Sequence, residues 1–332
     1  MNKFDSLRPK NLYDDVLAQR KLDGTEFFRL YADKFVDVRC LACNADGSFE
    51  FHKWGFSHKR CQNCSTLYVS PRPKEDLLIS YYNDFKSPNM WTRLLLSADT
   101  ERKKLQYQPR AELILSLTKL DKNKNAVIVD VGAGSGAFCL AMKSTGMFNK
   151  VVALDIADEA LEACEKNGLD TIKGMMSDAE TSSADLITVN DLIEHLFNPK
   201  EFLIDSLRVL KAGGYISIAT PNGEGFDFKI LKEKTKNITP PEHINYFNPK
   251  SIELLLKASG FVDIQVITPG ILDVDIIKKE VQNGFNLSVH NEWLDYLYQE
   301  SDEVLENFQK FLSGNKLSSH MLAVARKPIS KE

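Results

Sequence analysis

The chain lacks any apolar run long enough to cross a membrane, since its longest apolar stretches fall well short of the roughly 20 residues that a spanning helix needs. Its first residues, Met1 to Ser6, lack the apolar core of a secretory signal peptide. Basic residues form no long uninterrupted run, and 42 lysines and arginines stand against 46 acids, for a net charge of −4. We therefore expect a cytoplasmic protein with no membrane span and no broad basic face for nucleic acid.

Cysteine is scarce, at six of 332 residues, yet four of the six form two Cys-x-x-Cys pairs: Cys40 with Cys43, and Cys61 with Cys64. The loop between the pairs has a length within the zinc-ribbon range. Four thiolates from two tight turns can surround one tetrahedral Zn²⁺ and leave no position open for water or substrate. The pattern predicts a structural zinc site. Disulfides are the alternative, and a reducing cytoplasm disfavours them.

The most informative segment is a buried-strand pattern, residues 126–131, that runs directly into a glycine turn. Glycines let the backbone bend tightly and approach a ligand, while the free N–H groups of the helix that follows attract an anion. A second strand pattern, residues 151–155, ends in an acid about twenty residues beyond the turn, where a ribose diol needs an acceptor. Gly132, Gly134 and Ala137 also satisfy the G-x-G-x-x-A pattern of NAD sites. The turn alone therefore leaves a dinucleotide and S-adenosylmethionine both open.

Two later segments favour S-adenosylmethionine. One runs from Asp185 to Pro199 and contains Asn-Asp-Leu-Ile-Glu-His, and the other runs from Arg208 to Asn222 and contains Leu-Lys-Ala-Gly-Gly. With the glycine turn, these motifs stand in the order typical of class I S-adenosylmethionine-dependent methyltransferases, and the chain resembles that family over roughly residues 127–260. NAD-binding folds have no reason to place Glu-His and a Gly-Gly helix stop at these intervals.

The resemblance implies an α/β fold, a Rossmann-like and mostly parallel sheet whose last strand is antiparallel, preceded by a small zinc ribbon and a helical segment. The length and the 43% hydrophobic composition suit two domains, or one domain with additions. The expected units are a helical segment at 1–37, the zinc ribbon at 38–72, linking helices at 73–122, the cofactor-binding core at 123–270, and C-terminal helices with a final strand at 271–332.

The resemblance also implies the residues that bind S-adenosylmethionine. The glycines face the methionine portion with Asp130 near its ammonium group, Asp155 takes the ribose hydroxyls, and Asp178 meets the adenine amino group. Ile156 and Leu192 sandwich the ring, while Asn190 and Asp191 close the pocket near the methionine. The expected cofactor set is Asp130, Gly132, Gly134, Gly136, Asp155, Ile156, Asp178, Asn190 and Asp191.

A stiff loop after the fifth strand carries Pro240-Pro241-Glu242-His243, and this segment is similar to bacterial methyltransferases of sugars and surface polysaccharides that also carry a zinc ribbon. By that resemblance, His195, Glu242 and His243 lie at the acceptor site. A histidine accepts a proton near neutral pH, so His243 is the first candidate base and His195 the second. There are alternatives to these roles at the acceptor site. His195 could only pack the loop over the cofactor, and Glu242 could be an exposed carboxylate of the loop. His320 and the pair Tyr81-Tyr82 are expected to be surface or packing residues.

These features predict methyl transfer to a sugar or small polar metabolite of bacterial surface-glycan biosynthesis. An RNA methyltransferase that docks nucleic acid on its zinc ribbon is the first alternative, which Lys53, Lys59, Arg60 and Arg72 keep open. An NAD-dependent dehydrogenase and a non-catalytic binding module are the others. The acceptor atom, the sugar and the oligomeric state stay open.

Overall fold

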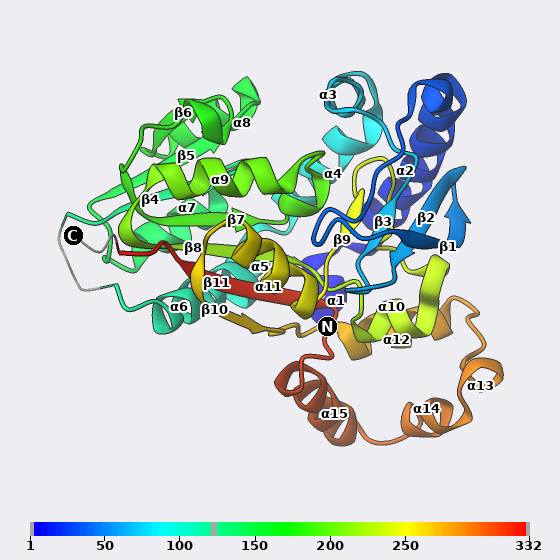
Figure 1. Ribbon diagram of the computed structural model, residues 1–332. Coiled ribbons are helices and arrows are strands. Elements are labelled where there is room, and N and C mark those ends of the chain that lie inside the picture. Colours follow the sequence, from blue (N-terminus) through cyan, green and yellow to red (C-terminus); the bar gives the residue numbers. More distant parts are fainter. Residues whose placement is uncertain (1–2, 121–124, 330–332) are drawn as a thin grey trace.

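A seven-stranded sheet forms the centre of the computed structural model, which describes residues 3–120 and 125–329 (Figure 1). In spatial order its strands are β10 (Val262–Ile267), β11 (His320–Arg326), β8 (Leu210–Pro221), β7 (Ala184–Asn190), β4 (Val127–Val131), β5 (Lys150–Asp155) and β6 (Asp170–Lys173). The strands from β8 to β6 pair in parallel, and β11 lies antiparallel between β8 and β10. The predicted fold class, a mostly parallel sheet with an antiparallel last strand, is confirmed.

Helices cover both faces of this sheet, which explains why the central strands read as nearly continuous apolar runs. Alternate residues of β4 enter two different cores: Ile128 packs on one side, and Val129 and Val131 on the other. The helices on the Ile128 side are α6 (Gln108–Leu117), α7 (Ala137–Ser144) and α8 (Asp158–Lys166), and those on the Val129 side are α9 (Pro199–Val209) and α11 (Pro249–Ala258).

The cysteine pairs belong to a second, four-stranded antiparallel sheet beside the first (Figure 1). In spatial order its strands are β1 (Gly47–Lys53), β2 (Phe56–Cys61), β3 (Leu67–Val69) and β9 (Asn245–Tyr246). The short hairpin expected between the cysteine pairs is β1–β2. Strand β9 comes from the loop after β8, so backbone hydrogen bonds join the ribbon to the stiff Pro-Pro-Glu-His segment. The unit boundaries stay predictions, and strand pairing crosses two of them, at β9 and at β11.

The N-terminal helices pack beside the ribbon and reach that same loop. They are α1 (Lys3–Leu7), α2 (Lys10–Tyr31), α3 (Glu75–Asp84), α4 (Lys86–Ser97) and α5 (Asp99–Arg102), with a 3-10 turn at Ala32–Lys34 and a π-helical turn at Lys103–Tyr107. A Cβ on Gly24 of α2 would lie 2.6 Å from the carbonyl oxygen of Pro240. Glycine at this position therefore lets the acceptor loop approach α2 closely.

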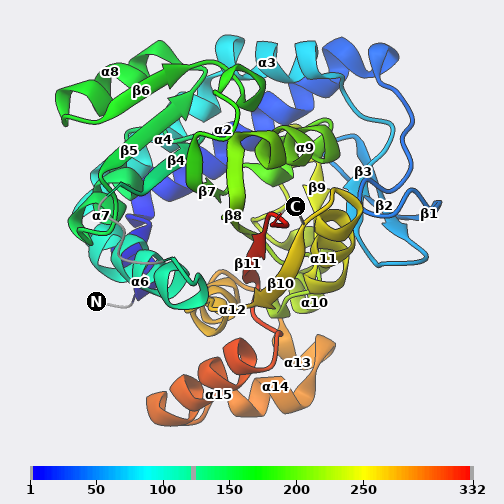
Figure 2. The same cartoon turned by 60° about the vertical axis from the view of Figure 1, so that its left-hand side comes forward.

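A helical group between β10 and β11 extends below the sheet and packs on one shared apolar cluster (Figure 2). Its helices are α12 (Asp273–Gln282), α13 (Leu287–His290), α14 (Glu292–Leu297) and α15 (Asp302–Gly314), and α10 (Phe226–Leu231) contributes to the same cluster. Three further 3-10 turns lie at Met176–Asp178, Ile193–His195 and Lys232–Lys234. Within residues 3–120 and 125–329, no helix combines the length and the apolar character needed to span a bilayer.

Candidate active site

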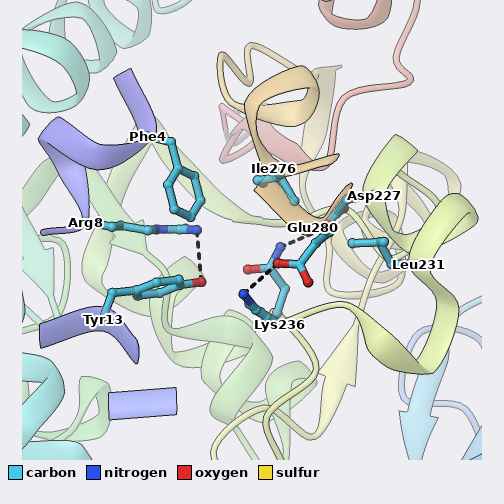
Figure 3. Close-up of a pocket in the computed structure, with 9 residues that line it drawn as sticks. Phe4, Arg8, Tyr13, Asp227, Leu231, Lys236, Ile276 and Glu280 are labelled. Atoms are coloured by element: carbon cyan, nitrogen blue, oxygen red, sulfur yellow. Dashed lines mark hydrogen bonds and ion pairs between the residues drawn. The ribbon is translucent and has the colours of Figure 1, made fainter. Parts of the chain in front are cut away.

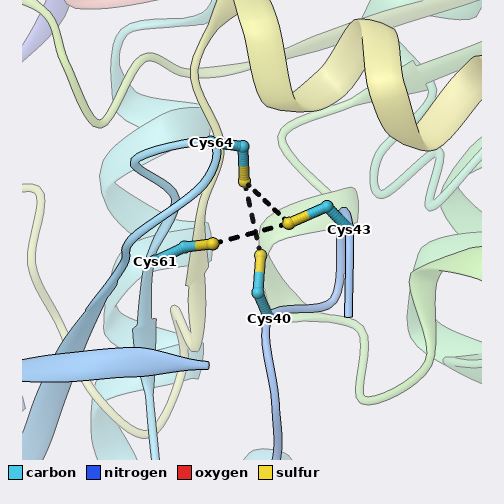
Figure 4. Close-up of side chains that lie close together, drawn as sticks. All are labelled: Cys40, Cys43, Cys61 and Cys64. Atoms are coloured by element: carbon cyan, nitrogen blue, oxygen red, sulfur yellow. Dashed lines mark hydrogen bonds between the residues drawn. The ribbon is translucent and has the colours of Figure 1, made fainter. Parts of the chain in front are cut away.

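The four cysteines of the two Cys-x-x-Cys pairs converge on one point (Figure 4). Three Sγ–Sγ distances, Cys40–Cys64, Cys43–Cys61 and Cys43–Cys64, are each 3.5 Å. A tetrahedral Zn²⁺ about 2.3 Å from each sulfur separates the sulfurs by about 3.8 Å. The four thiols therefore fit a closed zinc site, whereas a disulfide requires sulfurs only about 2.05 Å apart.

This cysteine cluster is tied to the core sheet as well as to the ribbon. The backbone carbonyl of Cys64 accepts a hydrogen bond of 2.8 Å from the side-chain amide of Asn248, the residue that caps the N-terminus of α11. The local fold of the ribbon and its attachment to the core thus depend on the same turn.

We expect Cys43→Ser to remove the metal and destabilise the protein, because three thiolates bind zinc far more weakly than four. The zinc content should fall from one per chain, and the free energy of unfolding should drop by about 4 kcal/mol or more, as expected when a structural metal is lost. Elemental analysis and urea denaturation measure the two effects. Cys164→Ser, at a buried cysteine outside the cluster, is the control. Zinc retained at one per chain in Cys43→Ser means that the ligand set is wrong.

The glycine turn lies at the carboxyl end of β4, the edge where α/β sheets bind ligands. Asp130 is buried there and accepts hydrogen bonds from the Thr188 hydroxyl at 2.6 Å and the Asn190 side-chain amide at 3.2 Å. Burial raises the pKa of Asp130 to about 6. The carboxylate is thus anchored to the neighbouring strand β7 rather than to its own turn, and it has oxygen lone pairs left for the expected ammonium group.

Asp155, at the end of β5, holds the glycine turn in shape. One of its oxygens accepts from the backbone N–H of Gly134 at 2.9 Å, and the other accepts from the N–H of Ala157 at 3.0 Å. A Cβ on Gly134 would meet no atom within 4 Å, so this glycine faces open space. A Cβ on Gly136 would instead lie 2.7 Å from Leu169, so glycine at 136 also serves helix packing.

The three residues expected around the adenine ring are Ile156, Asp178 and Leu192. They lie at the same edge of the sheet as the glycine turn, but their local contacts differ. Leu192 touches the position of a Cβ on Gly132, at 3.3 Å, and Ile156 is exposed. The carboxylate of Asp178 accepts from the backbone N–H of Met175 at 2.8 Å and caps its own short turn. Leu192 and Ile156 are therefore accessible to a ring, whereas Asp178 already has a local partner. All three assignments stay predictions.

Asn190 and Asp191, at the end of β7, join a polar network that sequence reasoning missed. Arg110 donates to the side-chain oxygen of Asn190 at 2.9 Å and lies 3.8 Å from a carboxylate oxygen of Asp191. His320 Nε2 lies 3.0 Å from the other Asp191 oxygen, a contact that the sequence analysis did not predict. The contact between His320 and Asp191 depends on the pairing of β11 with β8, which places His320 opposite Pro221. No local sequence pattern predicts this pairing.

Two histidines lie together beyond β7 and β8. The imidazole rings of His195 and His243 are perpendicular, with centroids 4.6 Å apart. The Tyr82 hydroxyl is 2.7 Å from His195 Nδ1, and His243 Nδ1 donates to the carbonyl oxygen of Asn237 at 2.9 Å. Burial lowers the pKa of His195 to about 4 and holds the pKa of His243 well below its usual range. Both rings are therefore neutral at pH 7.

Glu194 lies beside this pair and is 1% exposed. One carboxylate oxygen accepts from the Thr220 hydroxyl at 2.9 Å, while the other, Oε1, has no hydrogen-bond partner among the described residues. Burial, reinforced by the charge of Asp191, raises the pKa of Glu194 to about 8. Its backbone carbonyl accepts from the N–H of Ile244 at 3.0 Å, which ties the acceptor loop to this turn.

The Glu242 carboxylate is buried and is not exposed on the loop. It is 3% exposed, and its two oxygens accept from Arg20 of α2 at 3.1 and 2.6 Å. The Tyr81 hydroxyl donates to it at 3.4 Å, and the Arg20 guanidinium lies 4.2 Å from the centre of the Trp91 ring. The ion pair therefore fastens the acceptor loop to the N-terminal helix. Arg20 was missed because it is 222 residues from Glu242.

We expect Arg20→Ala to lower the free energy of unfolding by about 3–5 kcal/mol, because it leaves the Glu242 carboxylate buried without its cation. Urea denaturation measures the change. Arg29→Ala is the matched control on the same helix: it removes an ion pair with Glu26 that is exposed to solvent, and little change is expected. Equal effects of the two substitutions would contradict a structural role for the Arg20–Glu242 pair.

A small cavity lies between the N-terminal helices α1 and α2 and the helices α10 and α12 (Figure 3). Arg8, Tyr13 and Lys236 line it, and its volume is about 10 Å³. This is room for about one water molecule. The cavity is therefore too small to hold the acceptor.

Comparison with known proteins identifies the fold. Residues 74–266, more than half of the chain, match a family model described as a methyltransferase domain. An uncharacterized protein of Methanocaldococcus jannaschii is 28% identical over 160 residues, which are 47% of this chain and 75% of that protein. The ubiquinone biosynthesis O-methyltransferase of Idiomarina loihiensis is 26% identical over 132 residues, 37% of this chain and 51% of that protein. The chain thus spans only about half the length of this second relative.

A solved structure has the same fold. Phosphoethanolamine N-methyltransferase 2 of Haemonchus contortus, in complex with S-adenosyl-L-methionine, superposes with a TM-score of 0.50 at 17% identity, over 79% of this chain and 63% of that one. The family match sets the dehydrogenase alternative aside. With its glycine turn at the carboxyl end of β4 and its antiparallel last strand, the chain belongs to the methyltransferase-domain family and has the class I fold of S-adenosylmethionine-dependent methyltransferases.

Proposed function

We propose that this protein transfers a methyl group from S-adenosylmethionine to a hydroxyl of a small polar acceptor, a sugar of bacterial surface-glycan biosynthesis being the first candidate. The observation that carries the proposal is the position of the His195–His243 pair, beyond the same strand ends that bear the glycine turn. A methyl donor bound at the turn and an acceptor over the two rings would meet at this edge of the sheet.

The chain's own residues supply both halves of such a site. Asp130, Gly132 and Gly134 would hold the methionine portion, and Asp155 the ribose, with Ile156, Asp178, Asn190 and Asp191 completing the pocket as the resemblance implies. The donor supplies an electrophilic methyl group on a sulfonium. The four cysteines would hold a structural zinc that stiffens the ribbon and, through Asn248, the start of α11.

Methyl transfer is a displacement in which the acceptor oxygen must lie in line with the methyl, so positioning supplies much of the rate. The acceptor hydroxyl must also be activated. His243 is the first candidate because its Nδ1–H is bound to a carbonyl, which leaves the lone pair of Nε2 for this task. A neutral imidazole activates a hydroxyl by accepting its proton or by holding a cation that lowers its pKa. For Glu242 we propose a positioning role through its pair with Arg20.

The basic residues of the ribbon argue against an RNA acceptor, because each is already engaged within the protein. Arg72 is fully buried and donates to Asn245, and the Lys53 ammonium donates to the carbonyl oxygen of Thr235 at 2.7 Å. Lys59 pairs with Asp37, and Arg60 with two acids. Phosphate binding needs clustered cations that are free to meet it. A small acceptor is therefore favoured.

The function is tested by calorimetry on the zinc-loaded protein. S-adenosylhomocysteine is titrated first, with NAD in parallel, and the titration is repeated with nucleotide sugars, with a catechol as the phenolic acceptor that the ubiquinone-pathway relatives suggest, and with transfer RNA. Binding of S-adenosylhomocysteine alone among the cofactors, tightened by a nucleotide sugar and followed by methylation of that sugar, is expected. Methylation of the catechol or of the RNA would replace the sugar as the proposed acceptor. Failure of S-adenosylhomocysteine to bind would overturn the proposal.

A further inference from the structure

Three potential metal ligands meet at the acceptor side of the site. One nitrogen of His195, one nitrogen of His243 and a carboxylate oxygen of Glu194 all lie within 4.8 Å of one another. They come from two segments that the fold brings together, since the 3-10 turn Ile193–His195 follows β7 and His243 belongs to the loop after β8. The hydrogen bond from the Ile244 N–H to the Glu194 carbonyl holds these segments in register.

The hydrogen bonds around the two rings are those expected of metal-binding histidines. A histidine ligand usually binds the metal through one nitrogen and uses the other to contact a carbonyl, carboxylate or hydroxyl that orients the ring. His243 Nδ1 donates to the carbonyl of Asn237, and His195 Nδ1 is bonded to the Tyr82 hydroxyl. The bond to Asn237 uses Nδ1 of His243 and so leaves its Nε2 for a ligand. The His195 ring also lies near the backbone carbonyls of Asp191 and Glu242, and a cation would compete with them for its second nitrogen.

The carboxylate of Glu194 is only half satisfied. Oε2 accepts from Thr220, whereas Oε1 is buried and without a partner in the described residues. A buried oxygen without a partner costs free energy unless another group meets it. Neither imidazole forms a hydrogen bond with this oxygen in the structure. A cation between the three side chains would satisfy this oxygen and bind one nitrogen of each ring.

We propose that Glu194, His195 and His243 bind a divalent first-row transition-metal ion, such as Mn²⁺, that receives the acceptor. Two imidazoles and one carboxylate on one side of such an ion leave positions open on the other. Two neighbouring oxygens of the acceptor, as in a vicinal diol, would fill them. His195 and His243 are only partly buried.

The proposed ion would explain how His243 activates the acceptor hydroxyl. This inference rests on the proposed function, methyl transfer to a hydroxyl. The metal-bound hydroxyl would lose its proton to water because the cation lowers its pKa. The resulting oxygen would form a bond to the methyl carbon as the carbon–sulfur bond breaks, and the sulfur would keep that electron pair as S-adenosylhomocysteine. His195 and His243 would then act as ligands and not as the proton acceptors themselves.

Mn²⁺ is the probe for the test, because it favours oxygen and nitrogen ligands and discriminates against the thiolates of the ribbon. Zinc-loaded protein is titrated with Mn²⁺, and the loss of the free-ion signal is followed by electron paramagnetic resonance. One Mn²⁺ per chain is expected, with pulsed spectra showing coupling to imidazole nitrogen. Glu194→Gln and His243→Gln should remove this binding. Tyr82→Phe should weaken it by roughly 10-fold, because it removes only a partner of a ligand.

The control is His52→Gln, at an exposed ribbon histidine, which should keep the Mn²⁺. Each variant is also titrated with S-adenosylhomocysteine, whose retained binding shows that the core is folded. Absence of a stoichiometric Mn²⁺, or binding that survives in His243→Gln and Glu194→Gln, overturns the metal site. If S-adenosylhomocysteine binds and Mn²⁺ does not, the proposed function stands and only the metal fails. If Mn²⁺ binds and S-adenosylhomocysteine does not, the metal site stands and the proposed function fails.

Discussion

Gly134→Arg should abolish the binding of S-adenosylhomocysteine, with an affinity loss of about 100-fold or more, equivalent to about 2.8 kcal/mol. Gly134 has φ +53° and a Cβ there would meet nothing within 4 Å, so a side chain would project into the space in front of the turn. An arginine would fill the region that the methionine portion is expected to occupy. Calorimetry with S-adenosylhomocysteine measures the loss.

Gly146→Arg is a matched control for this substitution. Gly146 also has a left-handed backbone, with φ +69°, and also faces open space. It lies before β5, however, and therefore away from the carboxyl ends of the strands. The two variants share the backbone strain and the added charge, so only the location differs. Wild-type affinity in Gly134→Arg would refute the proposed cofactor pocket.

His243→Ala should leave the affinity for S-adenosylhomocysteine unchanged and reduce turnover by about 10²–10⁴-fold, the usual contribution of a group that activates a hydroxyl. The expectation holds whether His243 takes the proton or binds a cation, because both roles need the lone pair of Nε2. Turnover is measured with the acceptor found by the titration panel, at saturating S-adenosylmethionine.

His52→Ala controls for the loss of a histidine elsewhere, because His52 is exposed in the ribbon, where its Nδ1 lies 3.2 Å from the Ser57 hydroxyl. It should leave turnover unchanged. A double variant, His195→Ala with His243→Ala, should be little worse than His243→Ala alone if the rings act as one unit. Unchanged turnover in His243→Ala would remove this residue from the mechanism.

Local sequence patterns were enough to predict the glycine turn, at the edge of the sheet where the cofactor is expected to bind, and the cysteine cluster. The segment around Gly132 and Gly134 predicts a strand, a turn and a helix from apolar runs and glycine alone, because these depend on backbone preferences within a few residues. The two Cys-x-x-Cys pairs likewise predict the ribbon, since one tight turn already brings the two thiols of each pair together. The order of the later motifs carries the resemblance to class I methyltransferases, and that resemblance implied the sheet with its antiparallel last strand.

The sequence by itself therefore determined the position of the glycine turn and of the two cysteine pairs, which rest on short-range spacing, and its resemblance to a known family implied the class of fold. Tertiary structure alone decided which partners complete the site. Glu242 meets Arg20 across 222 residues, His195 meets Tyr82 across 113, and Asp191 meets His320 across 129. Such contacts depend on how helices and strands pack, which no periodicity encodes. For this reason the sequence did not reveal that the Glu242 carboxylate pairs with Arg20, or that the Tyr82 hydroxyl lies within hydrogen-bonding distance of the His195 ring.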